Sequence, residues 1–245
     1  MGVIAENVKR VRAEMEEAAL RAGADPASVL LVAASKTKGP PDIREAIAAG
    51  VDAVGENRTV ELTEKQAQGA YTGAPLHFIG RLQHNKLRFV VGQADLIQSV
   101  DSVALLRRVG QRAVQLGVRQ DILLQVNIGR EESKGGLDPA AVDEAAALAG
   151  TLDGLRLMGL MAIPPAWEAG GSGWPGSGKY PYFDEMYQLF VDIKGKKYDN
   201  ICMRFLSMGM SGDFAEAIGA GANMVRVGSA IFGARPPRLD ENACR

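Results

Sequence analysis

The chain has 245 residues, of which 47% are hydrophobic and 23% are charged, and its formal net charge is -1. This length suits two small domains or one α/β barrel of about 250 residues, and the composition is typical of a soluble globular protein. The balanced charge predicts no attraction to nucleic acid or anionic membranes, and no apolar stretch approaches the ~20 residues that span a bilayer.

Few residues of the chain suit metal binding or disulfide formation. Cys202 and Cys244 are far apart and match neither a disulfide framework nor a metal knuckle. His77 and His84 are the only histidines, so we expect no multi-histidine metal site and no Ser-His-Asp triad. The first 12 residues are charged and lack the apolar core of a signal peptide. We therefore expect a cytoplasmic protein without a metal site.

Strands and helices are predicted to alternate along the chain after one helix over 3–22, which Gly23 ends. Apolar runs bounded by turn residues predict eight strands, at 29–36, a short strand ending at 55–57, 76–80, 96–100, 122–128, 155–163, 203–207 and 223–227. Helical spacing predicts the segments between them as helices, at 41–49, 58–68, from 84, 103–116, from 138, 183–194, 211–219 and a last turn after 228. Asp101 and Ser102 are candidate caps for the helix 103–116.

Eight strand–helix units in one chain of this length predict a single (β/α)8 TIM barrel over 1–245, with the extra N-terminal helix (1–23) as a lid or plug. An open doubly wound sheet is the alternative, but the Gly-x-Gly-x-x-Gly turn expected after its first strand is absent. The segment 167–180 is rich in Gly, Ser and Pro, and predicts a flexible loop after the sixth strand. This loop is either a lid over the barrel or a tolerated surface insertion.

Lys36 is a candidate reactive group because it ends the first apolar strand. In a barrel the carboxyl ends of the strands converge on one face, where active sites form. Burial disfavours the charged form of a lysine, and the neutral amine can form a Schiff base with a carbonyl. The alternative is a lysine that reaches solvent where its strand stops. The other polar residues at strand ends are Asn57, Arg81, Gln83, Ser99, Asn127, Ser207 and Arg226.

Two turns of small residues follow the seventh and eighth strands. The first runs from Ser207 through Ser211, and the second contains Gly228 and Ser229. Backbone N–H groups of such turns bind phosphate, and this is the usual phosphate site of a barrel. The alternative is that Ser211 and Ser229 only cap helices.

Arg226 lies within an apolar strand, and a buried arginine needs a partner. It is a candidate donor to a ring nitrogen or an anion of a ligand. The alternative is an ion pair with a nearby acidic residue such as Glu56. His77 is expected at the entrance of its strand as a packed or solvated residue.

Seven segments together resemble the YggS/PROSC family of pyridoxal phosphate homeostasis proteins, in the same order and from about residue 30 to 233. They are LVAASKTKGPPDIREAIAAG, VGENRTVEL, HFIGRLQHNK, SVDS, NIGREESKGG, MGLMAI and FLSMGMSGDFAEAIGAGANMVRVGSAIFG. The sequence departs from the family pattern at Arg81, His84, Gly135 and the loop 167–180, which leaves the cofactor anchors intact.

The resemblance implies a barrel similar to the N-terminal domain of alanine racemase. It implies pyridoxal 5'-phosphate held as a covalent aldimine, or Schiff base, on Lys36. It also implies phosphate contacts from Ser207, Ser211, Gly228 and Ser229, and ring contacts from Asn57 and Arg226.

Two functions remain open on this resemblance. The first is a non-enzyme that holds the cofactor and acts in intracellular vitamin B6 homeostasis. The alternative is a cofactor-dependent amino-acid racemase, but an arginine at the ring nitrogen makes the ring a weaker electron sink. The predicted barrel closes near Gly233, so we expect the chain to lack the further domain that supplies the second base of alanine racemases. An aldolase-type barrel that uses Lys36 without a cofactor fits the resemblance less well. We expect a monomer with no catalytic residues, whose partners are pyridoxal phosphate and apo-enzymes that need it.

Overall fold

A computed structural model of the chain describes residues 2–131, 133–165, 181–196 and 198–233. Its strands are β1 (Leu30–Ala34), β2 (Ala53–Glu56), β3 (Leu76–Phe78), β4 (Leu96–Val100), β5 (Gln120–Val126), β6 (Leu155–Ala162), β7 (Ile201–Ser207) and β8 (Met224–Val227). Its α-helices are α1 (Val3–Arg21), α2 (Pro40–Ala48), α3 (Thr59–Ala67), α4 (Val103–Leu116), α5 (Val142–Gly150), α6 (Pro181–Gly195), α7 (Phe214–Gly219) and α8 (Ser229–Phe232). Short 3-10 helices cover Pro26–Ser28 (η1), His84–Phe89 (η2) and Pro139–Ala141 (η3).

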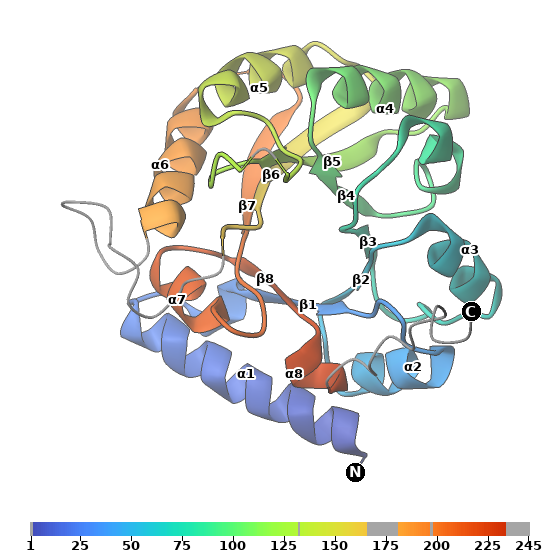
Figure 1. Ribbon diagram of the computed structural model, residues 1–245, viewed down its shortest axis with the longest axis vertical. Helices are drawn as coiled ribbons and strands as arrows, with labels where there is room; N and C mark the ends of the chain where they lie inside the picture. The colour runs from blue at the N-terminus through green and yellow to red at the C-terminus, as the bar shows by residue number, and fades with distance from the viewer. Residues whose placement is uncertain (1, 132, 166–180, 197, 234–245) are drawn as a thin grey trace, which may run out of the picture.

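The eight strands form a closed parallel barrel in chain order, and β8 pairs with β1 to close it. The helices surround the barrel as an outer layer (Figure 1). This arrangement confirms the predicted (β/α)8 fold. It also brings the residues that follow β1, β2 and β8 together at one end of the barrel.

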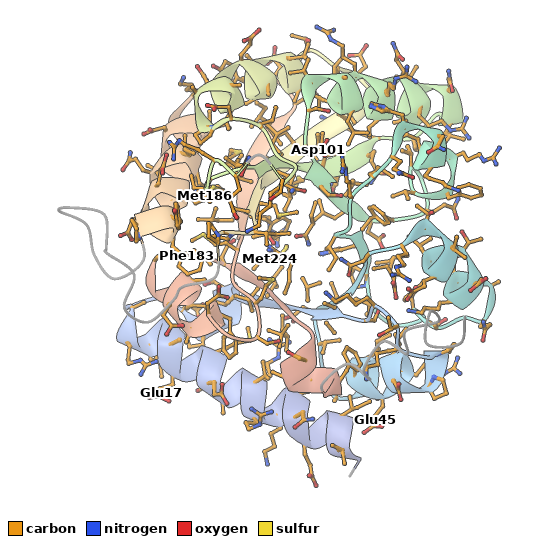
Figure 2. The ribbon with its side chains drawn as sticks, in the orientation of Figure 1. Glu17, Glu45, Asp101, Phe183, Met186 and Met224 are labelled. Carbon is orange, nitrogen blue, oxygen red and sulfur yellow. The ribbon has the colours of Figure 1, made fainter. Side chains whose placement is uncertain are left out.

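Alternate residues of each strand face the inside of the barrel, as strand geometry requires. The interior contains an apolar cluster of seven fully or nearly buried residues, Val32, Ala53, Leu96, Leu123, Met158, Met161 and Met224. Met224 lies near the centre of the barrel, whereas Glu17 and Glu45 lie on the outside (Figure 2). A larger apolar cluster lies between the strands and the helices and forms the main core.

The N-terminal helix α1 lies along the outer wall of the barrel, against α2, α7 and α8 (Figure 1). Its buried face, which includes Val8, Val11 and Met15, packs on Phe214 and Ile231. Burial of these side chains stabilises the pair of strands where the barrel closes. The helix does not cross an end of the barrel, so the expectation of a lid or plug is wrong.

Three other local expectations are answered by the structure. Ser102 caps α4 by accepting a hydrogen bond from the backbone N–H of Leu105, at 3.2 Å. The helix expected from residue 84 is the 3-10 helix η2, and the helix expected from 211 begins later, at Phe214. The loop expected at 167–180 lies outside the described residues. None of the described helices is long and apolar enough to cross a membrane.

Candidate functional site

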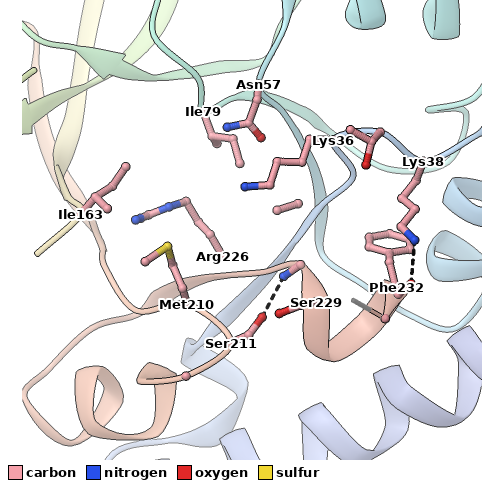
Figure 3. Close-up of a pocket in the computed structure, with 15 residues that line it drawn as sticks. Lys36, Lys38, Asn57, Ile79, Ile163, Met210, Ser211, Arg226, Ser229 and Phe232 are labelled. Carbon is pink, nitrogen blue, oxygen red and sulfur yellow. Dashed lines mark hydrogen bonds between the residues drawn. The ribbon is translucent and has the colours of Figure 1, made fainter. Parts of the chain in front are cut away.

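A cavity of about 350 Å³ opens at the carboxyl ends of β1, β2 and β8. Six of the residues singled out in the sequence line it, namely Lys36, Asn57, Ser211, Arg226, Gly228 and Ser229. The side chains of Lys36, Asn57 and Arg226 extend into this space from three neighbouring strands (Figure 3). The fold therefore brings the amine, the amide and the guanidinium together from positions up to 190 residues apart in sequence.

Lys36 follows β1 by two residues, so it lies in the turn after the strand and not in the strand itself. Its side chain is half-buried, which fits neither a fully buried amine nor a side chain free in solvent. Figure 3 shows the amino group aimed into the cavity, between Asn57 and Arg226. The amine therefore lies at the cavity, and its role there stays a prediction.

Asn57 follows β2 and presents a polar atom that lacks a partner. Its Oδ1 is buried and accepts no hydrogen bond from any described residue. A buried polar atom without a hydrogen bond is costly, and such atoms are commonly satisfied by a ligand or water. Asn57 lines the cavity, but this oxygen is covered by surrounding atoms and does not face the open space.

Arg226 is buried within β8 and has well-defined partners. Its two terminal nitrogens donate to Ser207 Oγ, at 2.7 Å, and to the carbonyl oxygen of Ala162, at 2.8 Å. Burial lowers the pKa of the guanidinium to about 10, and the nearby charge of Asp213 counteracts this. The side chain remains a cation at neutral pH. The alternative of an ion pair with Glu56 is wrong, because Glu56 bonds to Lys65 instead, at 2.6 Å.

A chain of hydrogen bonds runs from Arg226 into the barrel interior. The Ser207 hydroxyl accepts from Arg226 and donates to Gln98 Oε1, at 2.7 Å. The Gln98 amide nitrogen in turn lies 2.9 Å from His77 Nδ1. The arginine can only donate to Ser207, and the Gln98 amide nitrogen can only donate to His77 Nδ1. Ser207 is thus buried behind Arg226 and orients it, whereas the cavity wall is made by other residues.

The turn after β7 contacts the turn after β8. Ser211 Oγ accepts from the backbone N–H groups of Gly228 and Ala230, at 3.2 and 3.3 Å. This hydroxyl and the Ser229 hydroxyl lie at the same wall of the cavity (Figure 3). The wall therefore contains two hydroxyl groups, which can bind phosphate oxygens, whereas the N–H groups of Gly228 and Ala230 are already bonded to Ser211.

The remaining strand-end residues lie elsewhere. Arg81 and Gln83 line a separate hollow beside Asp101 and Gly135. The Ser99 hydroxyl is buried without a hydrogen bond from the described residues. Asn127 holds its own loop by donating to the carbonyl oxygen of Glu131, at 2.9 Å. A strand-end position therefore does not by itself place a side chain in the cavity.

His77 is packed inside the barrel, as one of the two expectations had it. It is 7% exposed, and burial lowers its pKa to about 4.

The sequence reasoning missed the ion network of Glu56, Glu61 and Lys65 behind Lys36. The spacing of Glu61 and Lys65, four residues apart on a helix, is the signal that could have revealed half of it. The described residues contain no cluster of three or more His, Cys, Asp or Glu that could hold a metal ion.

Comparisons with known proteins show the family to which the chain belongs. Residues 3–236 match the family model described as alanine racemase, N-terminal domain. A pyridoxal phosphate homeostasis protein of Pseudomonas aeruginosa is 40% identical over 236 residues, which cover 96% of this chain and 97% of that protein. A protein of the same name from Escherichia coli is 41% identical over 240 residues, covering 96% and 98%.

Solved structures show the same likeness. PipY of Synechococcus elongatus, with pyridoxal phosphate (PLP) bound, is 33% identical with a TM-score of 0.76, covering 94% of this chain and all of that chain (100%). The same protein without PLP has a TM-score of 0.80. An alanine racemase of Clostridium difficile is 13% identical with a TM-score of 0.67, and the match covers 95% of this chain but 61% of the racemase. The likeness to the racemase is one of fold.

Proposed function

The chain belongs to the family of pyridoxal phosphate homeostasis proteins, and on that basis we propose that it binds pyridoxal 5'-phosphate in the cavity at Lys36. We further propose that Lys36 holds the cofactor covalently as a Schiff base. The protein would thereby buffer or deliver the cofactor to apo-enzymes, without turning over a substrate.

The observation that carries this proposal is the convergence of Lys36, Asn57 and Arg226 at one end of a cavity whose other wall contains the Ser211 and Ser229 hydroxyls. When bound, the cofactor supplies an aldehyde that condenses with a primary amine, and a pyridine ring that draws electrons. The position of the Lys36 amine at the cavity supports the fit, because the aldehyde needs a primary amine within reach.

Each residue of the cavity has a proposed part. Lys36 supplies the amine, and Arg226 supplies a fixed cation at the pyridine nitrogen. Ser211, Gly228 and Ser229 are proposed to bind the phosphate. Ser207 is proposed to act at a distance from it, by holding the Arg226 guanidinium in place at 2.7 Å.

The absence of turnover is supported by the composition of the cavity wall. Racemisation needs a second acid–base group on the far face of the substrate. Among the described residues, the wall contains no Tyr, His, Cys, Asp or Glu side chain. Its second lysine, Lys38, donates to the carbonyl oxygen of Phe232, at 2.8 Å. A cationic Arg226 at the ring nitrogen would also keep the ring unprotonated, which weakens it as an electron sink.

A comparison of two lysine variants tests the covalent link. We expect the protein with added cofactor to show a visible absorbance band, and borohydride reduction to fix the cofactor on the peptide that contains Lys36. Lys36→Ala should abolish both signals. Lys38→Ala is the matched control, because Lys38 lines the same cavity, and it should retain both. Equal labelling of the Lys36→Ala variant would refute the assignment.

A panel of amino acids tests the absence of turnover. Each is incubated with the loaded protein, and racemisation and transamination are measured by chiral chromatography. We expect no product above that formed by free cofactor, and transfer of the cofactor to an added apo-enzyme. Product formation that Lys36→Ala abolishes would overturn the non-enzyme proposal.

A further inference from the structure

Two carboxylates and one ammonium group are buried directly behind the turn that contains Lys36. Glu56, the last residue of β2, is fully buried, and the side chains of Lys65 and Glu61 on α3 are 9% and 17% exposed. Lys65 Nζ lies 2.6 Å from Glu56 Oε1 and 3.0 Å from Glu61 Oε2. Because buried charges are stable only when paired, the three side chains form one ion network.

The network also bonds to the main chain on both sides of Lys36. Before Lys36, the Ser35 carbonyl oxygen accepts from Lys65 Nζ, at 3.1 Å, and Ser35 Oγ donates to Glu56 Oε1, at 2.5 Å. After Lys36, the Thr37 backbone N–H donates to Glu61 Oε2, at 2.8 Å. Hydrogen bonds to ionised groups are stronger than neutral ones. Lys36 is therefore held between two residues whose backbones are anchored by charged side chains.

Thr37 adopts a backbone conformation that requires such an anchor. Its φ is 65°, in the left-handed region, which is unfavourable for a β-branched residue. The Thr37 residue is exposed, so burial of its side chain does not offset the strain. Strained residues at the edge of a site persist only where the surroundings fix them. The bond from the Thr37 N–H to Glu61 helps to fix this residue, together with the bond from the Lys38 N–H to the Ser35 carbonyl oxygen, at 3.0 Å.

We propose that Glu61, Lys65 and Glu56 are positioning residues, which hold the backbone of residues 35–37 so that the Lys36 amine stays aimed into the cavity. This inference rests on the proposed function, because it concerns how readily Lys36 captures the cofactor. Glu61 is the decisive member, since its carboxylate joins Lys65 to the strained peptide after Lys36. None of the three touches the cavity wall, so each acts through the turn that carries Lys36.

The test compares Glu61→Gln with Glu64→Gln. Both residues are on α3, but the Glu64 side chain is exposed and forms no hydrogen bond or ion pair among the described residues. Hydrogen exchange of the Thr37 backbone amide measures the anchor directly and needs no cofactor. We expect exchange about tenfold faster in Glu61→Gln, the size expected for loss of a hydrogen bond to a charged group, and no change in Glu64→Gln.

A second measurement separates positioning from binding. The rate of covalent attachment is followed by the visible absorbance after pyridoxal phosphate is added. We expect it to fall several-fold in Glu61→Gln. Pyridoxamine phosphate lacks the aldehyde, so its affinity reports the other contacts of the cavity, and we expect that affinity to be unchanged. A purely structural role for Glu61 would lower both quantities together.

Three results would overturn the inference. These are amide exchange in Glu61→Gln equal to that in Glu64→Gln, faster exchange with an unchanged attachment rate, or an equal loss of pyridoxamine phosphate affinity. If Glu61→Gln does not fold, Glu61→Asp keeps the charge but shortens the reach to Thr37, and the same exchange and attachment results are expected. If the wild-type protein takes up no cofactor, the proposed function fails, whereas amide exchange still decides whether the anchor exists.

Discussion

His77 makes the stability of the barrel depend on pH in a way that the structure allows to be calculated. Its Nδ1 accepts from the Gln98 amide nitrogen, at 2.9 Å, and the amide oxygen of Gln98 accepts from Ser207. Burial lowers the pKa of His77 to about 4, from the ordinary value of 6.5, and the Asp95 charge opposes this only in part. A proton on Nδ1 would place this N–H opposite the N–H of the Gln98 amide, and both groups are donors. The folded protein therefore keeps the His77 ring neutral.

The sign and size of the effect follow from this difference in pKa. Between about pH 4 and 6.5, the unfolded chain binds a proton at His77 that the folded chain does not bind, so stability falls as the pH falls. From pH 7 to pH 5 this histidine alone should lower the free energy of unfolding by about 2 kcal/mol. That is a large fraction of the 5–15 kcal/mol by which domains are typically stable.

Urea unfolding at the two pH values, for the wild type and His77→Asn, measures this quantity. Asparagine keeps an acceptor near the position of Nδ1 but does not titrate. Any loss of packing in the variant is the same at both pH values, so it cancels in the comparison. We expect the wild type to lose about 2 kcal/mol more than His77→Asn between pH 7 and pH 5. His84→Asn, a change at an exposed histidine, is the control and should behave as the wild type. Equal losses in the wild type and His77→Asn would refute the reasoning.

Two further substitutions test the residues around the cavity. Arg226→Met leaves the Ala162 carbonyl oxygen and Ser207 Oγ without their donor, so urea unfolding should show a loss of stability of about 1–3 kcal/mol. The visible band of the bound cofactor should also shift. An unchanged band would contradict the proposed contact between Arg226 and the cofactor ring. In Gly80→Ala the new Cβ would lie 1.9 Å from the Asn57 carbonyl oxygen, so the turn that contains Asn57 must move. We expect the free energy of unfolding to fall by about 1–3 kcal/mol and cofactor binding to weaken. Gly195→Ala is its control, because nothing lies within 4 Å of that position, and equal behaviour of the two variants would contradict the prediction.

The sequence was sufficient to predict the barrel and six of the residues that line its cavity. Alternating apolar strands and amphipathic helices admit few architectures, since parallel strands need covering helices on the outside. Closure of the barrel then brings the carboxyl ends of β1, β2 and β8 together at one end of the barrel, and Lys36, Asn57 and Arg226 lie there. The capping of α4 by Ser102 was predictable for a local reason, because a cap depends on residues only a few positions apart.

The pairing of the buried charges was decided by the tertiary structure alone. The sequence left Glu56 as a candidate partner for Arg226, since both belong to strands near the same edge. In the folded barrel Arg226 is paired in register with Val32 and faces the interior, whereas Glu56 faces outward to Lys65 on α3. Successive side chains of a strand point to opposite faces, so a shift of one residue in register would exchange these environments. Sequence therefore determined which residues reach the cavity at the carboxyl end of the barrel, and only the register of the closed sheet determined which charges meet there.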